Sequence, residues 1–161
     1  MKIVALLPVK NEDWILPTTL KPLCEISDHI IAADQFSTDN TKTILSNEEK
    51  VTIIQNEEVV HSNKVRWRLL DESRKLFGEN NIIINLDADE IIPPKLFYKK
   101  LKQIQQYPAG TLFSAQWTQL WRSINMYRSD DGVWNPKKNR KIFLFRDNGK
   151  QQYSNEFILN D

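Results

Sequence analysis

Apolar residues in the first half of the chain gather in short runs that are nearly continuous rather than alternating. These runs are rich in β-branched residues and cover residues 2–8 (KIVALLP), 29–34 (HIIAAD), 51–55 (VTIIQ) and 82–87 (IIINLD). Strands that are covered on both faces of a parallel sheet have this composition, because neither face meets water. We therefore predict four buried parallel strands.

The segments between these runs have the apolar spacing and the end residues of helices. We predict helices at residues 12–23, at 38 or 39 to 44, at 63–77 and at 95–106. In the third, Val65, Leu69, Leu76 and Phe77 fall on one side, and Gly78 follows as a helix C-cap. The strand–helix alternation predicts an α/β domain with a mostly parallel, Rossmann-like sheet and helices on both faces.

The pattern changes after Pro108. Residues 111–121 and 141–146 alternate more between apolar and polar positions, which predicts an antiparallel C-terminal extension of the sheet. The polar segment 125–140 lies between them, and we expect the basic run 135–141 (NPKKNRK) to be a solvated loop.

Tryptophan side chains either pack inside a fold or offer a flat face on which a ligand ring can stack. Trp117 and Trp121 fall within a strand-like run, so we expect both to pack in the core, and we expect Trp14 to pack at a helix start. Trp134 lies in the polar segment beside two aspartates, where stacking and packing are equally open.

Composition narrows the class of protein. The chain has 161 residues, with 22 Lys and Arg against 21 Asp and Glu, so its size predicts one domain and its charge does not favour nucleic acid. Cys24 is the single cysteine, which excludes an intramolecular disulfide, and we expect a buried thiol. No run approaches the roughly 20 apolar residues of a membrane helix, and no signal peptide is recognisable. We therefore expect a cytoplasmic protein without a transmembrane segment.

Polar residues follow three of the four predicted strands. Asn11 and Glu12 follow the first strand, Asp34 ends the second, and Asp87 and Asp89 end the fourth. The carboxyl ends of parallel strands meet at one edge of a sheet, where ligands bind. Carboxylates gathered there repel one another unless a cation is present. Oxygen ligands without nearby Cys or His favour Mg²⁺ or Mn²⁺, held by one or two carboxylates and by substrate phosphates.

The motifs at these strand ends resemble those of the family 2 glycosyltransferases of the GT-A fold. They are PVKNE at 8–12, IIAADQFSTDNT at 30–41, VRWRLL at 65–70 and INLDADE at 84–90. The resemblance covers about residues 2–94 and fades beyond. It implies a single GT-A domain over 1–161, with a nucleotide-sugar-binding half (1–94) and an acceptor-side half (95–161) that is either minimal or truncated.

The resemblance implies roles for individual residues around a nucleotide. Pro8, Asn11 and Glu12 would line the nucleotide pocket, Asp34 would hold the uridine end, and Arg66 would contact the nucleotide. Many relatives carry a second acidic residue where this chain has Gln35, and an asparagine where it has Trp67. These departures leave the identity of the base open.

The acidic motif would supply the metal ligands. Asp87 would face the ribose and the shell of the metal, and Asp89 would bind Mn²⁺ or Mg²⁺ directly on the diphosphate. The implied reaction moves a sugar from a UDP-sugar to an acceptor hydroxyl with inversion, using a carboxylate base in the second half. The candidate bases are Asp130, Asp131 and Glu156, with Glu156 preferred.

Two alternatives remain from the sequence. A non-catalytic module or fragment that binds nucleotide sugars would carry the same motifs. A phosphatase of the haloacid dehalogenase type also has D-x-D after a strand, but near its N-terminus, and with Thr or Val where this chain has Ile91. A nucleotidyltransferase would need a glycine-rich loop after the first strand, and VKNED has no glycine. The sugar, the acceptor and the oligomeric state are not predicted.

Overall fold

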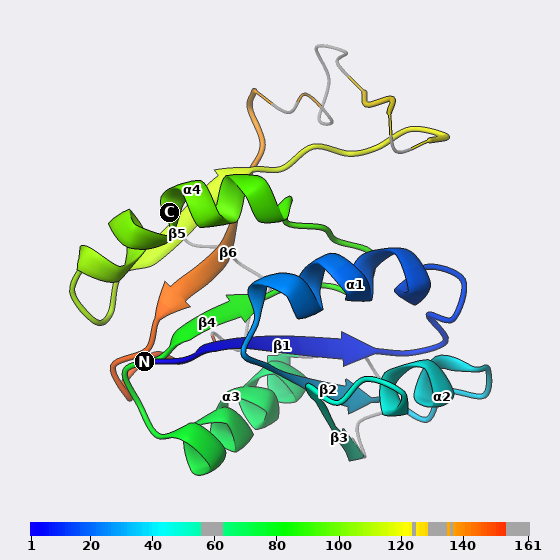
Figure 1. Cartoon of the computed structure of the whole chain (residues 1–161), viewed down its shortest axis with the longest axis horizontal. Helices are drawn as coiled ribbons and strands as arrows, with labels where there is room; N and C mark the ends of the chain where they lie inside the picture. The colour runs from blue at the N-terminus through cyan, green and yellow to red at the C-terminus, as the bar shows by residue number, and fades with distance from the viewer. Residues whose placement is uncertain (56–62, 124, 129–134, 136, 154–161) are drawn as a thin grey trace.

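A computed structural model describes residues 1–55, 63–123, 125–128, 135 and 137–153. In these residues the strands form one six-stranded sheet in the order β3-β2-β1-β4-β6-β5 (Figure 1). The strands are β1 (Ile3–Val9), β2 (His29–Asp34), β3 (Val51–Gln55), β4 (Ile82–Asn85), β5 (Leu112–Gln116) and β6 (Arg140–Arg146). The helices are α1 (Leu16–Ile26), α2 (Thr41–Ser46), α3 (Asn63–Phe77) and α4 (Pro94–Gln106).

Strands β1 to β4 run parallel, as predicted, and their register aligns the carboxyl ends. Val9 pairs with Asp34, and Asp34 pairs with Gln55. Leu6 pairs with Asn85, so β4 ends beside the middle of β1 and the chain continues from there along the same edge. The loops that follow β1, β2 and β4 therefore open at one edge of the sheet.

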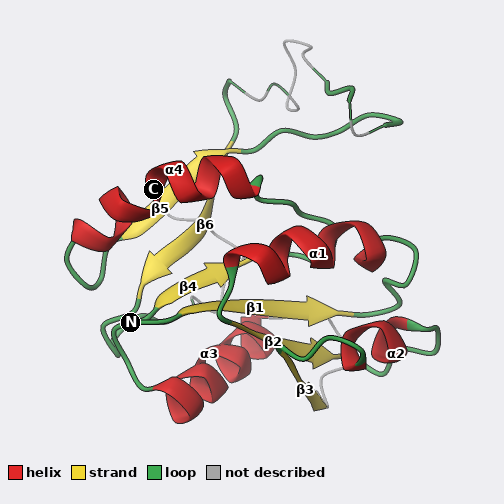
Figure 2. Ribbon diagram, in the orientation of Figure 1, coloured by secondary structure: helices red, strands yellow, loops and turns green. Residues whose placement is uncertain are grey.

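Helices cover both faces of the sheet, and this coverage explains the continuous apolar runs (Figure 2). Ala5 and Leu7 of β1 belong to a core that includes buried residues of α1, α2 and α4. Val4 and Leu6 point to the opposite face and pack in a second core with residues of α3. Since successive residues of a strand point to opposite faces, every position of β1 must be apolar to bury both.

The predicted antiparallel extension is confirmed, although its first strand is shorter than expected. Strand β6 pairs antiparallel with β4, placing Leu144 opposite Ile84, and β5 then pairs antiparallel with β6. Strand β5 lies at the edge of the sheet and ends at Gln116 instead of continuing to residue 121. Most of its residues are exposed.

The expectations that Trp117 and Trp121 pack in the core and that Trp14 packs at a helix start are wrong. Trp14, Trp117 and Trp121 are 69%, 38% and 45% exposed. The alternating pattern predicted a covered strand, but β5 is an edge strand and the chain leaves it before Trp117. The guanidinium groups of Arg122 and Arg128 lie 5.7 and 5.3 Å from the ring centre of Trp121. Trp134 lies outside the described residues.

Three smaller differences concern the helical faces and the cysteine. Helix α1 begins at Leu16, after a turn in which Leu16 N–H donates to the Glu12 carbonyl, and it continues to Ile26. In α3, Leu70 is buried and Leu76 is exposed, so Leu76 does not share the apolar face. Cys24 is partly rather than fully buried, and burial together with the charge of Glu48 raises the pKa of its thiol to about 11.

In the described part of the chain, no helix is long and apolar enough to cross a membrane.

Candidate functional site

The loops after β1 and β2 are joined side by side by hydrogen bonds. Asn11 N–H donates to Ser37 Oγ (2.9 Å), and Thr38 N–H donates to the side-chain oxygen of Asn11 (2.8 Å). Glu12 N–H donates to Thr41 Oγ1 (2.7 Å). Asn11 also has a left-handed backbone conformation, with φ of 54°, which asparagine tolerates better than most residues. Two of the sequence motifs thus form one folded unit.

The carboxylates of this unit accept hydrogen bonds from the unit's own backbone. Asp39 accepts from Asp13 N–H (3.0 Å) and from Thr41 N–H (3.0 Å). Asp34 is buried at the end of β2, where its carboxylate accepts Ser37 N–H at 3.3 and 3.4 Å. Pro8 is buried inside β1, opposite Ala33. The structure therefore gives Asp34 a role in shaping the turn.

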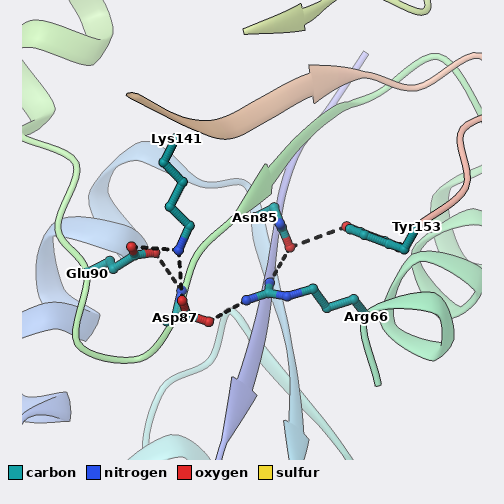
Figure 3. Close-up of polar contacts among 6 residues, drawn as sticks. All are labelled: Arg66, Asn85, Asp87, Glu90, Lys141 and Tyr153. Atoms are coloured by element: carbon teal, nitrogen blue, oxygen red, sulfur yellow. Dashed lines mark hydrogen bonds and ion pairs between the residues drawn. The ribbon is translucent and has the colours of Figure 1, made fainter. Parts of the chain in front are cut away.

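A second group of polar side chains lies where β4 ends (Figure 3). Arg66 of α3 is buried, and its guanidinium donates to Asn85 Oδ1 and forms an ion pair with Asp87 Oδ1. Arg66, to which the family resemblance gives a contact with the nucleotide, is thus held in place by Asn85 and Asp87 at the end of β4. Arg66 and Asp87 are brought together as part of one network.

Lys141 enters this group from the antiparallel strand β6. Its Nζ lies 2.7 Å from Asp87 Oδ2 and 2.7 Å from Glu90 Oε1. Glu90 uses its other oxygen to accept Asp87 N–H (2.9 Å). Burial alone would lower the pKa of Lys141, but the hydrogen bonds to Asp87 and Glu90 outweigh it and raise that pKa. Lys141 is therefore charged near neutral pH.

Tyr153 completes the group from the segment that follows β6. Its hydroxyl donates to Asn85 Oδ1 (3.3 Å), and its carbonyl accepts from Trp67 Nε1 (2.9 Å). Burial raises the pKa of Tyr153, so the hydroxyl stays protonated and can donate. Asn85 is thus held by a helix residue and by a residue near the end of the described chain.

Glu12 and Asp89 connect the two groups electrostatically. Burial raises the pKa of Glu12, and the charge of Asp89 raises it further, with smaller contributions from Asp39 and Asp87. Asp89 is exposed. Negative charge therefore accumulates between the loop after β1 and the acidic motif, where a cation would relieve it.

The donor set fits a divalent cation that takes few ligands from the protein. Among the described residues, no group of three or more His, Cys, Asp or Glu side chains is arranged to hold a metal. Both oxygens of Asp87 face cationic partners, whereas Asp89 is exposed and its charge raises the pKa of Glu12. Mg²⁺ and Mn²⁺ sites built from one or two carboxylates and substrate phosphates need no more than this.

Sequence reasoning missed part of this network. It did not assign a role to Asn85, Glu90 or Tyr153. It counted Lys141 both in the solvated loop 135–141 and in the strand 141–146; the strand is confirmed, and the loop assignment of Lys141 is wrong because its amine is hydrogen-bonded to two carboxylates. The apolar alternation of 141–146 did indicate the strand. The candidate bases Asp130, Asp131 and Glu156 lie outside the described residues.

Comparison with known sequences identifies a family. The sequence model of glycosyl transferase family 2 matches residues 5–158. A search of curated proteins finds no match.

Several solved structures have a similar fold. S. aureus TarS 1–349 matches with a TM-score of 0.54 at 22% identity, over 66% of this chain and 33% of that chain. Its complex with UDP-GlcNAc matches with a TM-score of 0.53 at 21% identity, over 66% and 32%. A 4-diphosphocytidyl-2C-methyl-D-erythritol synthase matches with a TM-score of 0.61 at 12% identity, over 91% and 74%. This chain therefore spans about a third of the TarS structure.

Proposed function

The chain belongs to glycosyl transferase family 2, and we propose that it transfers a sugar from a nucleotide-diphosphate sugar to an acceptor hydroxyl. One observation carries the proposal: the acidic motif at the end of β4 is held beside the loops that follow β1. Arg66 and Lys141 fix Asp87, and Asp89 stays exposed, with its charge acting on Glu12 of the loop after β1. This is the edge of a parallel sheet at which ligands bind.

We propose a UDP-sugar as the donor. The support is that TarS, which shares the fold, was solved with UDP-GlcNAc. In this proposal Pro8, Asn11 and Glu12 line the nucleotide pocket and Asp34 lies at its uridine end. The hydrogen bonds between the two loops support it, because they hold Asn11 and Glu12 in fixed positions.

Mn²⁺ or Mg²⁺ is the proposed cofactor, with Asp89 as its direct ligand and Asp87 in its surroundings. Asp89 is the better candidate for direct coordination, because Arg66 and Lys141 compete for both oxygens of Asp87. A divalent cation bound there supplies Lewis-acid stabilisation of the diphosphate leaving group. The residues around it orient the nucleotide, and the network at Asn85 keeps Arg66 in place.

The transfer itself needs a base near the acceptor. We propose that a carboxylate removes the proton of the acceptor hydroxyl while the oxygen attacks the anomeric carbon and the nucleotide diphosphate departs, with inversion. Glu156 and Asp131 are the proposed bases.

Binding of UDP tests the proposal directly. Calorimetry should show that UDP binds with Mn²⁺ and only weakly in EDTA, because Asp89 would hold the cation and the cation would offset the charge of the diphosphate. Asp89→Asn should remove the metal dependence and lower turnover of the sugar nucleotide by about a hundredfold or more. Asp71→Asn, at an exposed position of α3, is the matched control and should leave both unchanged. Equal UDP affinity with and without metal would contradict the proposed site.

The same experiment separates the rival functions. A nucleotide-sugar-binding module would bind UDP with metal but show no hydrolysis or transfer in any variant. The similar fold of the 4-diphosphocytidyl-2C-methyl-D-erythritol synthase raises nucleotidyl transfer as a third possibility. The loop between β1 and α1 has no glycine to cradle a triphosphate, which favours sugar transfer.

A further inference from the structure

Two of the three carboxylates of the acidic motif are paired with cationic side chains before any ligand binds. Asp87 has one cation at each oxygen, Arg66 at Oδ1 and Lys141 at Oδ2. Glu90 has Lys141 at one oxygen and Asp87 N–H at the other. Two carboxylates thus face two cationic side chains, and Asp89, the third carboxylate of the motif, is exposed.

The position of Lys141 is determined by the pairing of the strand on which it lies. It lies on β6, whose pairing with β4 brings the strand alongside the acidic motif. Its side chain is 24% exposed, and its amine donates to two carboxylates at 2.7 Å each. A charged amine placed between them restricts both carboxylates, since each would lose a charge-assisted hydrogen bond on turning away.

We infer that Lys141 is a positioning residue of the donor site, one that holds Asp87 and Glu90 away from the divalent cation and leaves Asp89 to coordinate it. The inference rests on the proposed function. With one protein carboxylate available, the cation binds weakly alone and firmly only when a nucleotide diphosphate adds its oxygens. Lys141 therefore makes cation and nucleotide binding strongly interdependent.

Removing the charge of Lys141 should weaken this interdependence in a measurable way. In Lys141→Met, Asp87 loses the partner of Oδ2 and can turn that oxygen toward the cation. We expect Mn²⁺ to bind about tenfold more tightly in the absence of nucleotide, because a positive charge is removed and a ligand is gained. By linkage, the factor by which UDP and Mn²⁺ strengthen each other's binding should fall correspondingly.

The experiment measures free Mn²⁺ by electron paramagnetic resonance in titrations of the whole chain, with and without UDP. Lys141→Arg keeps the charge and should behave like the wild type. Lys138→Met makes the same change of charge at an exposed neighbouring lysine, and it should leave Mn²⁺ affinity unchanged. Circular dichroism and thermal melting establish that each variant is folded, and Lys141→Gln replaces Lys141→Met if that variant does not fold.

A double variant separates positioning from general electrostatics. If Asp87 is the ligand gained, Lys141→Met combined with Asp87→Asn should lose the tighter Mn²⁺ binding. Unchanged Mn²⁺ affinity in Lys141→Met, or a gain that persists in the double variant, overturns the inference. A wild-type chain that fails to bind Mn²⁺ even with UDP would instead reject the proposed function.

Discussion

The parallel and antiparallel regions of the sheet differ in how they are held. Strands β1, β2 and β4 are buried along nearly their whole length by helices on both faces. Most residues of strand β5 are exposed. The apolar residues that follow it are exposed to between 38% and 59%: Trp117, Leu120, Trp121, Met126 and Tyr127. The parallel region is therefore held by its core, whereas the antiparallel region depends on its attachment to that core.

That attachment relies on a few specific polar contacts in addition to the β4–β6 ladder. Arg74 of α3 forms hydrogen bonds with both carboxylate oxygens of Asp147, just after β6, at 3.0 and 2.7 Å. Lys141 bonds to the acidic motif, and Arg146 donates to the carbonyls of Gln105 and Tyr107. The candidate site forms where the two regions meet, since Asp87 comes from one and Lys141 from the other.

The Arg74–Asp147 contact should be the most costly of these to break. Asp147 is only 1% exposed at its side chain, so Arg74→Met would leave a buried carboxylate unpaired. We expect a loss of about 3 kcal/mol in the free energy of unfolding, measured by urea denaturation. The double variant Arg74→Met with Asp147→Asn should recover much of it, because the unpaired charge is gone. A loss below about 1 kcal/mol, the range of exposed pairs, would show that this contact does not anchor the region.

A matched pair of leucines tests the difference in burial itself. Leu6 of β1 is fully buried, and Leu112 of β5 is 54% exposed. Leu6→Ala should cost about 3 kcal/mol through lost transfer energy and a residual cavity. Leu112→Ala should change stability by no more than about 0.5 kcal/mol, as exposed substitutions usually do. Similar losses in both variants, measured by denaturant unfolding, would mean that β5 is covered in solution.

This difference also explains how much the sequence could predict. The ranges expected for β2, β3 and α3 agree with the structure, because burial on both faces or on one helical side leaves a clear apolar pattern. Strand β5 was predicted too long, since alternation does not distinguish a covered strand from an exposed edge. Trp117 and Trp121 were misplaced for the same reason.

Long-range pairing limited the prediction of the site. The acidic motif follows a buried strand directly, so its place at the edge of the sheet could be inferred locally. The contact of Lys141 with Asp87 joins residues 54 positions apart and depends on the antiparallel pairing of β4 with β6. Tyr153 reaches Asn85 across 68 positions. No local pattern encodes such contacts.

The smallest effect concerns pH and again distinguishes the two regions. His29 begins β2, where its ring accepts or donates a hydrogen bond with Thr52 Oγ1 (2.9 Å). Burial, and then the charge of Lys2, lowers the pKa of His29. The unfolded chain therefore binds the proton more readily, so stability should fall as the pH drops below about 6.5.

His29→Gln should flatten this dependence between pH 7 and pH 5, because glutamine can keep a hydrogen bond with Thr52 but does not titrate. The chain after residue 94 has no histidine, so the antiparallel region should contribute little to the slope in this range. Urea denaturation at a series of pH values measures the slope for both proteins. An equally steep slope in His29→Gln would assign the pH dependence to another group, and a steeper fall in stability in His29→Gln than in the wild type would contradict the lowered pKa of His29.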